Sequence, residues 1–399
     1  MMFNPGSKLF VPTLVNMVFN FLMFLYIPLL SIYFKSVGLG EELIGIVFSL
    51  FSLFVIFFSP MIGNLSDHAG RKRVIYWGVA SQLLAVILYL WPATVASIII
   101  ARVFSAIGWS MVFLISLARI EDKIVDGERG SKAGVFLSFA FFGRVLAPLA
   151  GTFLAEVFFL RFPFLISAIG YTLLLVWLSL WKSHHKPVVR KKDFNPLSAL
   201  KLFWKERKLR TMAFVGVAMH TRLPVVTIFL PFLALSFGVG YQEVGILFFA
   251  REIMHVFQGY AGRYVDKKGG GSVTLVSVVL SSLFIILVGL TRSFWPLLVM
   301  LFLEGVANCF WNVSAWTFMS SIGENKKMEG VVVGSYTAIA RIGFFVFSIV
   351  SGFLAVRIGI SSLFIIVGVI SLVAVLACAP VLLDKHDKQN SFLKKLNAN

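Results

Sequence analysis

The chain has 399 residues, of which 59% are hydrophobic and only 14% charged, and its mean hydropathy is +0.91. This composition excludes an ordinary soluble globular protein, because water would have to solvate far too much apolar side-chain area. The formal net charge of +18 does not indicate a nucleic-acid partner, since the cations are scattered over short polar segments with no stacking aromatic residues organised around them.

Apolar runs long enough to cross a bilayer recur along the whole chain, since about 20 helical residues span a hydrocarbon core of ~30 Å. The first run is too long for the core of a signal peptide, and no small-residue cleavage site follows it, so we interpret it as a retained span. The predicted spans are 9–34, 43–63, 74–92, 94–118, 132–156, 162–182, 211–237, 243–262, 273–291, 295–320, 331–355 and 361–383. The predicted fold class is therefore an all-α membrane protein with twelve transmembrane helices in two six-helix halves.

The polar segments between these runs divide the chain into four parts. We predict an N-terminal half at 1–182, a basic cytoplasmic linker at 183–210, a C-terminal half at 211–383 and a cytoplasmic tail at 384–399. Within the linker, Asn195 is placed as an N-cap and Pro196 at the first helical position, which predicts a short amphipathic helix lying in the headgroup region.

A dense polar connector, GNLSDHAGRKRV, joins the second and third predicted spans. A thinner copy, GRYVDKKGGGSV, joins the second and third spans of the other half, so the chain contains an internal duplication. The glycines would permit close helix approach and a turn, and the aspartate would cap the next helix and accept hydrogen bonds from the arginine that follows. The residues of this motif, whose gating role is implied by a family resemblance and not by their spacing, are Gly63, Leu65, Asp67, Gly70, Arg71, Lys72, Gly262, Asp266 and Gly269.

The cations are unequally distributed between the two sides of the predicted membrane. One side carries only Lys35, Arg161, Arg292 and Arg357, whereas most of the 36 Lys and Arg residues lie on the other side. Because cytoplasmic loops carry the excess of Lys and Arg, we expect the rich side and both termini to be cytoplasmic. We therefore predict a multi-pass protein of the plasma membrane, with the lipid bilayer as a partner.

Ionisable residues inside the apolar runs predict a polar cavity at mid-membrane. Five arginines and two glutamates lie roughly 8–12 residues from the ends of their spans, which is about 12–18 Å deep. An arginine facing lipid would cost about 2.5–3.5 kcal/mol, so these side chains must face one another or a water-filled cavity. The predicted cavity residues are Asn16, Asn20, Arg102, Arg144, Arg222, Arg251, Asn308, Asn312 and Arg341.

The charge of this belt predicts the kind of substrate and the coupling ion. Because five arginines outnumber two glutamates, we expect an anionic substrate or an amphipathic one with an anionic head. Burial disfavours the charged form of a carboxylate, which lets a buried acid bind and release a proton near neutral pH. The predicted proton-coupling residues are Glu252, His255 and Glu304. A permanent structural pair with an arginine is the alternative role for Glu304.

The sequence contains no indication of an enzyme. Its two cysteines, Cys309 and Cys378, both fall inside apolar runs, so they predict neither a disulfide framework nor a metal site. We find no nucleophile–base pair and no phosphate-binding loop of the form G-x-x-x-x-G-K-[ST], which argues against ATP as the direct energy source. We therefore expect no enzymatic activity and no cofactor.

With these features the chain resembles the major facilitator superfamily. The first connector matches every defined position of that family's loop signature, G-x-L-x-D-x-x-G-R-[KR], whereas the second copy keeps Gly262, Asp266 and Gly269 but has glycines at the basic pair. The resemblance implies that this cluster latches the two halves together in the outward-facing state. Arg102 and Gly108 match part of the fourth-helix signature of proton-coupled members.

The fifth predicted span is closest in motif to the twelve-helix drug:proton antiporter group. That group carries G-x-x-x-G-P-x-x-G-G, and here Gly143, Pro148 and Gly151 remain, while Ala147 and Thr152 replace two glycines. An ordinary kinked helix with small packing residues would give a similar pattern. The resemblance therefore favours an exporter without establishing one.

Together these features predict a secondary active transporter that works by alternating access. The family resemblance implies that it works as a monomer. We expect proton-coupled efflux of a small amphipathic or anionic compound. One alternative is an importer or uniporter of organic anions. Another, from a different class, is a transporter-like membrane sensor or scaffold without transport, against which the intact gating motif argues.

Overall fold

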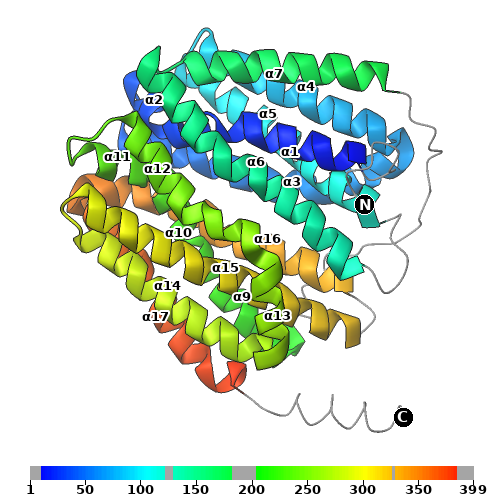
Figure 1. Cartoon of the computed structure of the whole chain (residues 1–399), viewed down its shortest axis with the longest axis vertical. Coiled ribbons are helices and arrows are strands. Elements are labelled where there is room, and N and C mark those ends of the chain that lie inside the picture. Colours follow the sequence, from blue (N-terminus) through cyan, green and yellow to red (C-terminus); the bar gives the residue numbers. More distant parts are fainter. Residues whose placement is uncertain (1–9, 122–128, 182–203, 326–328, 384–399) are drawn as a thin grey trace.

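A computed structural model of the chain describes residues 10–121, 129–181, 204–325 and 329–383, and within these ranges the regular structure is helical (Figure 1). The amphipathic helix predicted for the linker falls mostly outside these ranges, as does the predicted tail. The helices form two groups that lie one above the other in Figure 1.

The N-terminal group contains six spans, the first of which is interrupted. Its elements are α1 (Phe10–Phe24), the 3₁₀ turn η1 (Ile27–Leu29), α2 (Leu30–Ser36), α3 (Glu41–Ala69), α4 (Arg71–Leu90), α5 (Val95–Glu121), α6 (Arg129–Val157) and α7 (Phe162–Leu180). Pro28 at the start of η1 lacks the backbone N–H that a continuous helix would need, which accounts for the interruption.

The C-terminal group repeats this plan with two interrupted spans. Its elements are α9 (Arg207–His220), α10 (Arg222–Pro224), the π-helical η2 (Val225–Phe229), α11 (Leu230–Leu235), α12 (Tyr241–Glu252), the 3₁₀ turn η3 (Ile253–Phe257), α13 (Gln258–Lys268), α14 (Gly270–Leu290), α15 (Phe294–Asn325), α16 (Glu329–Ile358) and α17 (Ile360–Leu382). The chain from α9 to α11 forms one span, and the chain from α12 to α13 forms another.

Ten helical segments in the described ranges are long and apolar enough to cross a membrane. The other two predicted spans correspond to α6 and to the interrupted segment from α12 to α13. The latter carries two adjacent charged residues, Arg251 and Glu252, at its centre. These two spans also pack against each other across the boundary between the groups.

The two groups use the same packing scheme, as an internal duplication requires. In the first, α1 packs on α6, α4 on α5 and α4 on α7; in the second, α9 packs on α16, α14 on α15 and α14 on α17. The connectors also correspond in conformation. Gly70 has φ 87° and ψ 136°, and Gly269 has φ 90° and ψ 135°. This left-handed region favours glycine, which explains why glycine stands at both turns.

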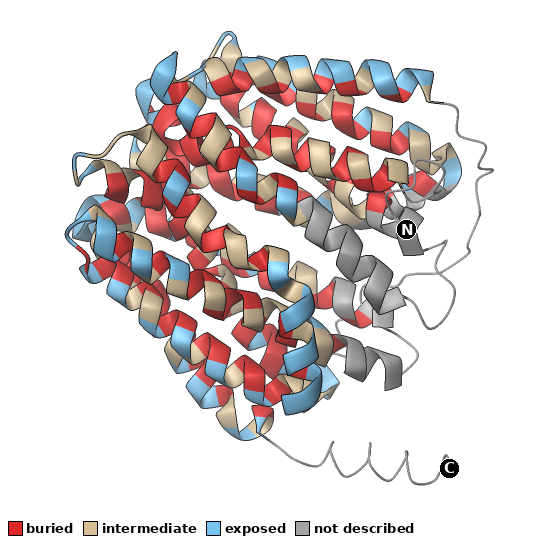
Figure 2. Ribbon diagram, viewed as in Figure 1, coloured by how far each residue is buried: buried red, intermediate tan, exposed pale blue. Residues whose placement is uncertain are grey.

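The groups meet along two helix pairs, α3 with α16 and α6 with α12. A main core of buried apolar side chains extends through both groups, and the buried residues follow the inner faces of the helices (Figure 2). We call the end that carries Gly70 and Gly269 the connector end and the other the opposite end. At the connector end of α3, Phe57, Met61 and Leu65 are exposed.

Candidate functional site

Interruptions of the seventh and eighth spans lie beside buried charged residues. Thr221 ends α9, Arg222 and Pro224 follow, and the chain then takes one π-helical turn. In the eighth span, Glu252 is the last residue of α12 before the 3₁₀ turn. Such departures from regular α-helix leave backbone groups free for other contacts and frequently mark functional sites.

Glu304 lies at the centre of a buried ionic network between these spans and α15. Its Oε2 accepts a hydrogen bond from Arg251 Nε at 2.8 Å, and its Oε1 lies 3.8 Å from Nη1 of Arg222. Ser281 Oγ and Asn308 Nδ2 also donate to Oε1, at 3.0 and 3.4 Å. The side chain of Glu304 has no solvent exposure. Two arginines therefore compensate one fully buried carboxylate.

Glu252 extends this network across the boundary between the two groups. Its Oε1 accepts a hydrogen bond from Arg251 Nη1 at 2.6 Å, and its Oε2 lies 3.2 Å from Arg144 Nη2 on α6. His255 Nδ1 is 3.9 Å from the same Oε2, and the His255 ring stacks on Phe141 of α6 with 5.3 Å between centroids. An ion pair and a ring stack thus join the groups at the middle of the α6–α12 boundary.

Arg144 and Arg341 differ from the other predicted cavity arginines in exposure. Arg222 and Arg251 have side chains only 1% and 4% exposed, whereas Arg144 is 32% exposed and Arg341 is half-buried. The guanidinium of Arg341, on α16, lies 4.7 Å from the ring centroid of Trp109, on α5 of the other group. We find no carboxylate partner for Arg341 among the described residues. Arg144 and Arg341 are therefore the belt arginines most available to a ligand.

Three other predicted cavity residues lie within the N-terminal group. Arg102 is 3% exposed, donates to the carbonyl oxygens of Val47 and Phe48 on α3, and packs on the Phe48 ring. Asn20 Nδ2 donates to the Asn16 backbone oxygen and to Asn16 Oδ1, and both asparagines are buried. The two asparagines thus lie on one face of α1, and each of the three residues is bound within its own group.

For Lys72, Leu65 and Gly262 of the gating motif, the described contacts lie inside the helix group that carries the residue. Lys72 donates to the backbone oxygen of Trp181 at the end of α7, and its Nζ lies 5.9 Å from the Trp181 ring centroid. Leu65 lines a pocket of about 580 Å³ on α3 and α5. Asp266 is exposed on α13, and a Cβ added at Gly262 would lie 3.8 Å from Val313. The side-chain surroundings of Gly63 and Asp67 lie outside the described residues.

Several contact residues have no distinguishing signal in the sequence. Ser281 sits in an apolar run. Phe24 and Phe141 are two of 42 phenylalanines and Trp109 is one of 9 tryptophans, and nothing local distinguishes them from the others. Only their positions beside Glu304, Arg144 and Arg341 single them out.

Asn312 is half-buried one helical turn from Asn308. Among the described residues, no group of His, Cys, Asp and Glu could hold a metal ion.

The opposite end is closed by contacts between the groups. Glu156, on α6, accepts a hydrogen bond through Oε2 from the backbone N–H of Tyr241 at 2.6 Å, at the N-terminus of α12. A Cβ at Gly240 would lie 2.8 Å from Glu156 Oε1, so a side chain at this position would displace the carboxylate. Lys35 pairs with Glu41 at 2.6 Å and lies 5.1 Å from the ring centroid of Phe232.

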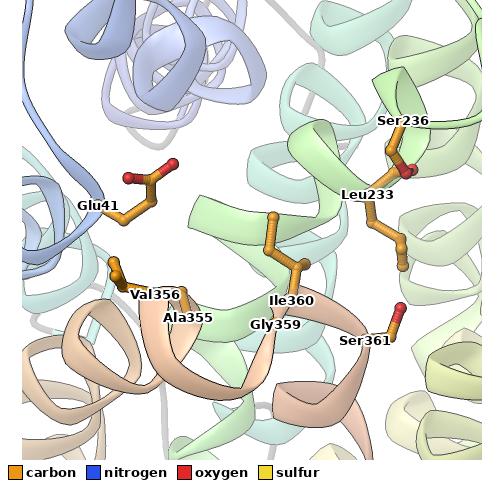
Figure 3. Close-up of a pocket in the computed structure, with 8 residues that line it drawn as sticks. All are labelled: Glu41, Leu233, Ser236, Ala355, Val356, Gly359, Ile360 and Ser361. Atoms are coloured by element: carbon orange, nitrogen blue, oxygen red, sulfur yellow. The ribbon is translucent and has the colours of Figure 1, made fainter.

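A pocket of about 490 Å³ lies at this end of the boundary (Figure 3). Glu41 of α3 forms one side, and residues of α11, α16 and α17 form the rest: Leu233, Ser236, Ala355, Val356, Gly359, Ile360 and Ser361. Its lining comes from both groups, so its shape depends on how they close.

The Glu156 contact predicts an effect on closure. Replacing Glu156 by Gln should loosen the opposite end, because an anion at a helix N-terminus stabilises it and accepts a charge-assisted hydrogen bond. Because Glu156 is exposed, solvent weakens this contact, and we expect it to contribute about 1 kcal/mol. Its loss should raise the fraction of molecules with an open opposite end roughly five-fold. The reporter is maleimide labelling of Ser348→Cys, a position that is fully buried beside Gly45 at the α3–α16 boundary. Unchanged labelling would contradict the prediction, and Glu42→Gln at the same end is the control.

Comparison with known proteins agrees with this architecture. A sequence model of the Major Facilitator Superfamily matches residues 13–326 and, in a second match, residues 212–398. An uncharacterized MFS-type transporter of Methanocaldococcus jannaschii, MJ1560, is 24% identical over 359 residues, which cover 86% of this chain and 92% of that protein.

Two further proteins have more specific descriptions. The multidrug resistance protein MdtG of Proteus mirabilis is 24% identical over 304 residues, covering 71% of this chain and 73% of MdtG. The crystal structure of the nucleoside transporter NupG superposes with a TM-score of 0.77 at 15% sequence identity, covering 95% of this chain and 100% of NupG. At that identity the superposition shows a shared fold.

Proposed function

Because the chain belongs to the major facilitator superfamily and is a multi-pass membrane transporter of small molecules, we propose that it couples proton movement to efflux of an anionic or amphipathic organic compound. The observation that carries the proposal is the pair Arg144 and Arg341. They come from different groups, both are partly exposed, and each lies against an aromatic ring. A cationic group beside an aromatic face suits an anion carried on an apolar body.

The proposed orientation places the connector end in the cytoplasm, with both termini on that side of the plasma membrane. It rests on the excess of Lys and Arg at that end. The contacts of Glu156 and Lys35 at the opposite end then correspond to closure toward the outside. In this orientation the structure is an inward-facing state of a monomer that works by alternating access.

For proton coupling we propose Glu252 and His255. They lie at the α6–α12 boundary, where Arg144 is partly exposed, so water and protons have a route to Glu252 when the groups separate. Glu304 is fully buried and held by two arginines, a geometry that favours the structural role for this residue. The multidrug relative supports efflux as the direction.

The test uses purified protein in proteoliposomes with a pH-sensitive dye inside. Under an imposed pH gradient, an anionic panel compound should move protons, whereas lipophilic cations and neutral sugars should not. Arg341→Ala or Arg144→Ala should lower anion transport at least ten-fold, the lower range for losing a charged hydrogen bond. Intact anion transport in both variants would refute the arginine site. Anion flux without proton movement would indicate the uniporter or importer, and binding without flux a sensor.

A further inference from the structure

Arg144 is the most exposed arginine of the described ionic network, and its carboxylate partner Glu252 has a second cation. Glu252 keeps Arg251 at 2.6 Å when Arg144 is set aside, and it is 5% exposed. The Arg144–Glu252 contact is longer, at 3.2 Å, and Glu252 Oε2 makes no hydrogen bond. The Arg222–Glu304 contact is longer still, at 3.8 Å, but both of its side chains are buried, so the Arg144–Glu252 contact is the one that an incoming ligand can reach and exchange.

Arg144 has unused capacity for a second partner. Its Nε is buried and has no hydrogen-bond partner, although Nη2 faces Glu252. Arginine recognises a carboxylate best through two parallel N–H donors. The pairing with Glu252 thus uses one side of the guanidinium and leaves the Nε donor of Arg144 without an acceptor.

Aromatic rings define the surroundings of the guanidinium. Its carbon lies 4.7 Å from the Phe24 ring centroid, on α1, and 5.5 Å from that of Phe141, on α6. Both rings belong to the N-terminal group, so they stay with Arg144 when the groups move apart. An incoming carboxylate on an aromatic or other apolar body would find apolar contacts beside the cation.

We propose that the substrate is an aromatic monocarboxylate whose carboxylate replaces Glu252 on Arg144. The exchange keeps one carboxylate on Arg144 throughout, and Glu252 remains paired with Arg251 and beside His255. The added anion brings the net charge of the network, three arginines against two glutamates or +1, to zero. It also removes the Arg144–Glu252 ion pair that joins the groups at mid-boundary. The inference rests on the proposed transport function and names the substrate class of the same site.

The exchange predicts that neutralising a carboxylate of the site strengthens the binding of the substrate. If Glu252 competes with the substrate, Glu252→Gln should bind benzoate more tightly than the wild type, by about five-fold for the loss of one partly exposed ion pair. Arg144→Gln should bind it at least ten-fold more weakly. The measurement is isothermal titration of benzoate into full-length protein in lipid nanodiscs, with neutral benzamide as the matched ligand and Glu42→Gln as the control for charge.

The outcomes separate this inference from the transport proposal. Unchanged or weaker benzoate binding by Glu252→Gln would overturn the exchange, even if proteoliposomes transport anions. Equal gains for benzoate and benzamide would overturn recognition of the carboxylate. If Glu252→Gln fails to fold, Glu252→Asp retains the charge but shortens the reach toward Arg144, and it should also bind benzoate more tightly. Absence of benzoate binding to both wild type and variant would overturn the substrate class.

Discussion

Replacing Glu304 by Ala is expected to lower the free energy of unfolding by about 3–5 kcal/mol, the usual cost of breaking a buried ion pair from one side. The reason is the position of Arg222. Its side chain is 1% exposed, and Glu304, at 3.8 Å, is the carboxylate that compensates it. Arg251 would keep Glu252, but Arg222 would be left with Met219 Sδ as its hydrogen-bond acceptor.

The measurement is thermal and denaturant unfolding of the purified protein in detergent. The double variant Arg222→Met with Glu304→Gln removes the charge on both sides and should recover most of the loss, because a buried ion pair can be replaced by uncharged groups at little cost. Glu42→Ala, a half-buried carboxylate at the opposite end, is the matched control and should change little. A Glu304→Ala protein that unfolds like the wild type would show that the network is not needed for stability.

Gly45→Ala is expected to shift the conformational equilibrium away from the closed opposite end and to reduce transport strongly. A Cβ at Gly45 would lie 3.1 Å from Cα of Gly352 and 3.2 Å from its nitrogen, and closer still to the backbone oxygen of Ser348. Because these neighbours are backbone atoms of α16, the helices would have to separate. Overpacking of this kind costs about 1–3 kcal/mol, which corresponds to roughly a 5- to 150-fold shift of the equilibrium.

Labelling of Ser348→Cys and transport in proteoliposomes measure the two effects. The matched control is Gly259→Ala on α13, where an added Cβ meets nothing within 4 Å. Both changes raise helix propensity equally, so a difference between them isolates the contact between the groups. Equal labelling and equal transport in the two variants would mean that the α3–α16 crossing does not control closure.

The number and order of the helices follow closely from the sequence. Length and hydropathy identify the spans, and two related connectors predict a duplication, but which helices pack together, such as α1 on α6 and α9 on α16, came only from the structure. The helix interruptions were harder to foresee. Pro28 and Pro224 are visible in the sequence, but nothing local distinguishes the 3₁₀ turn after Glu252 from continuous helix.

The candidate site could be predicted only as a set of residues. Burying five arginines requires partners or water, so composition alone determined that a polar belt exists. It could not determine which members stay inside one group, as Arg102 does on the carbonyl oxygens of α3.

The sequence by itself determined the membrane class, the duplicated halves, the connector turn at Gly70 and the family resemblance, because these depend on local periodicity, length and short motifs. Only the tertiary structure decided that Glu304 joins Arg222 to Arg251 and that Arg144 reaches Glu252 across the boundary. The physical reason is that hydropathy fixes how deep a side chain lies. Its partner depends on the rotation and crossing of helices that are far apart in the chain.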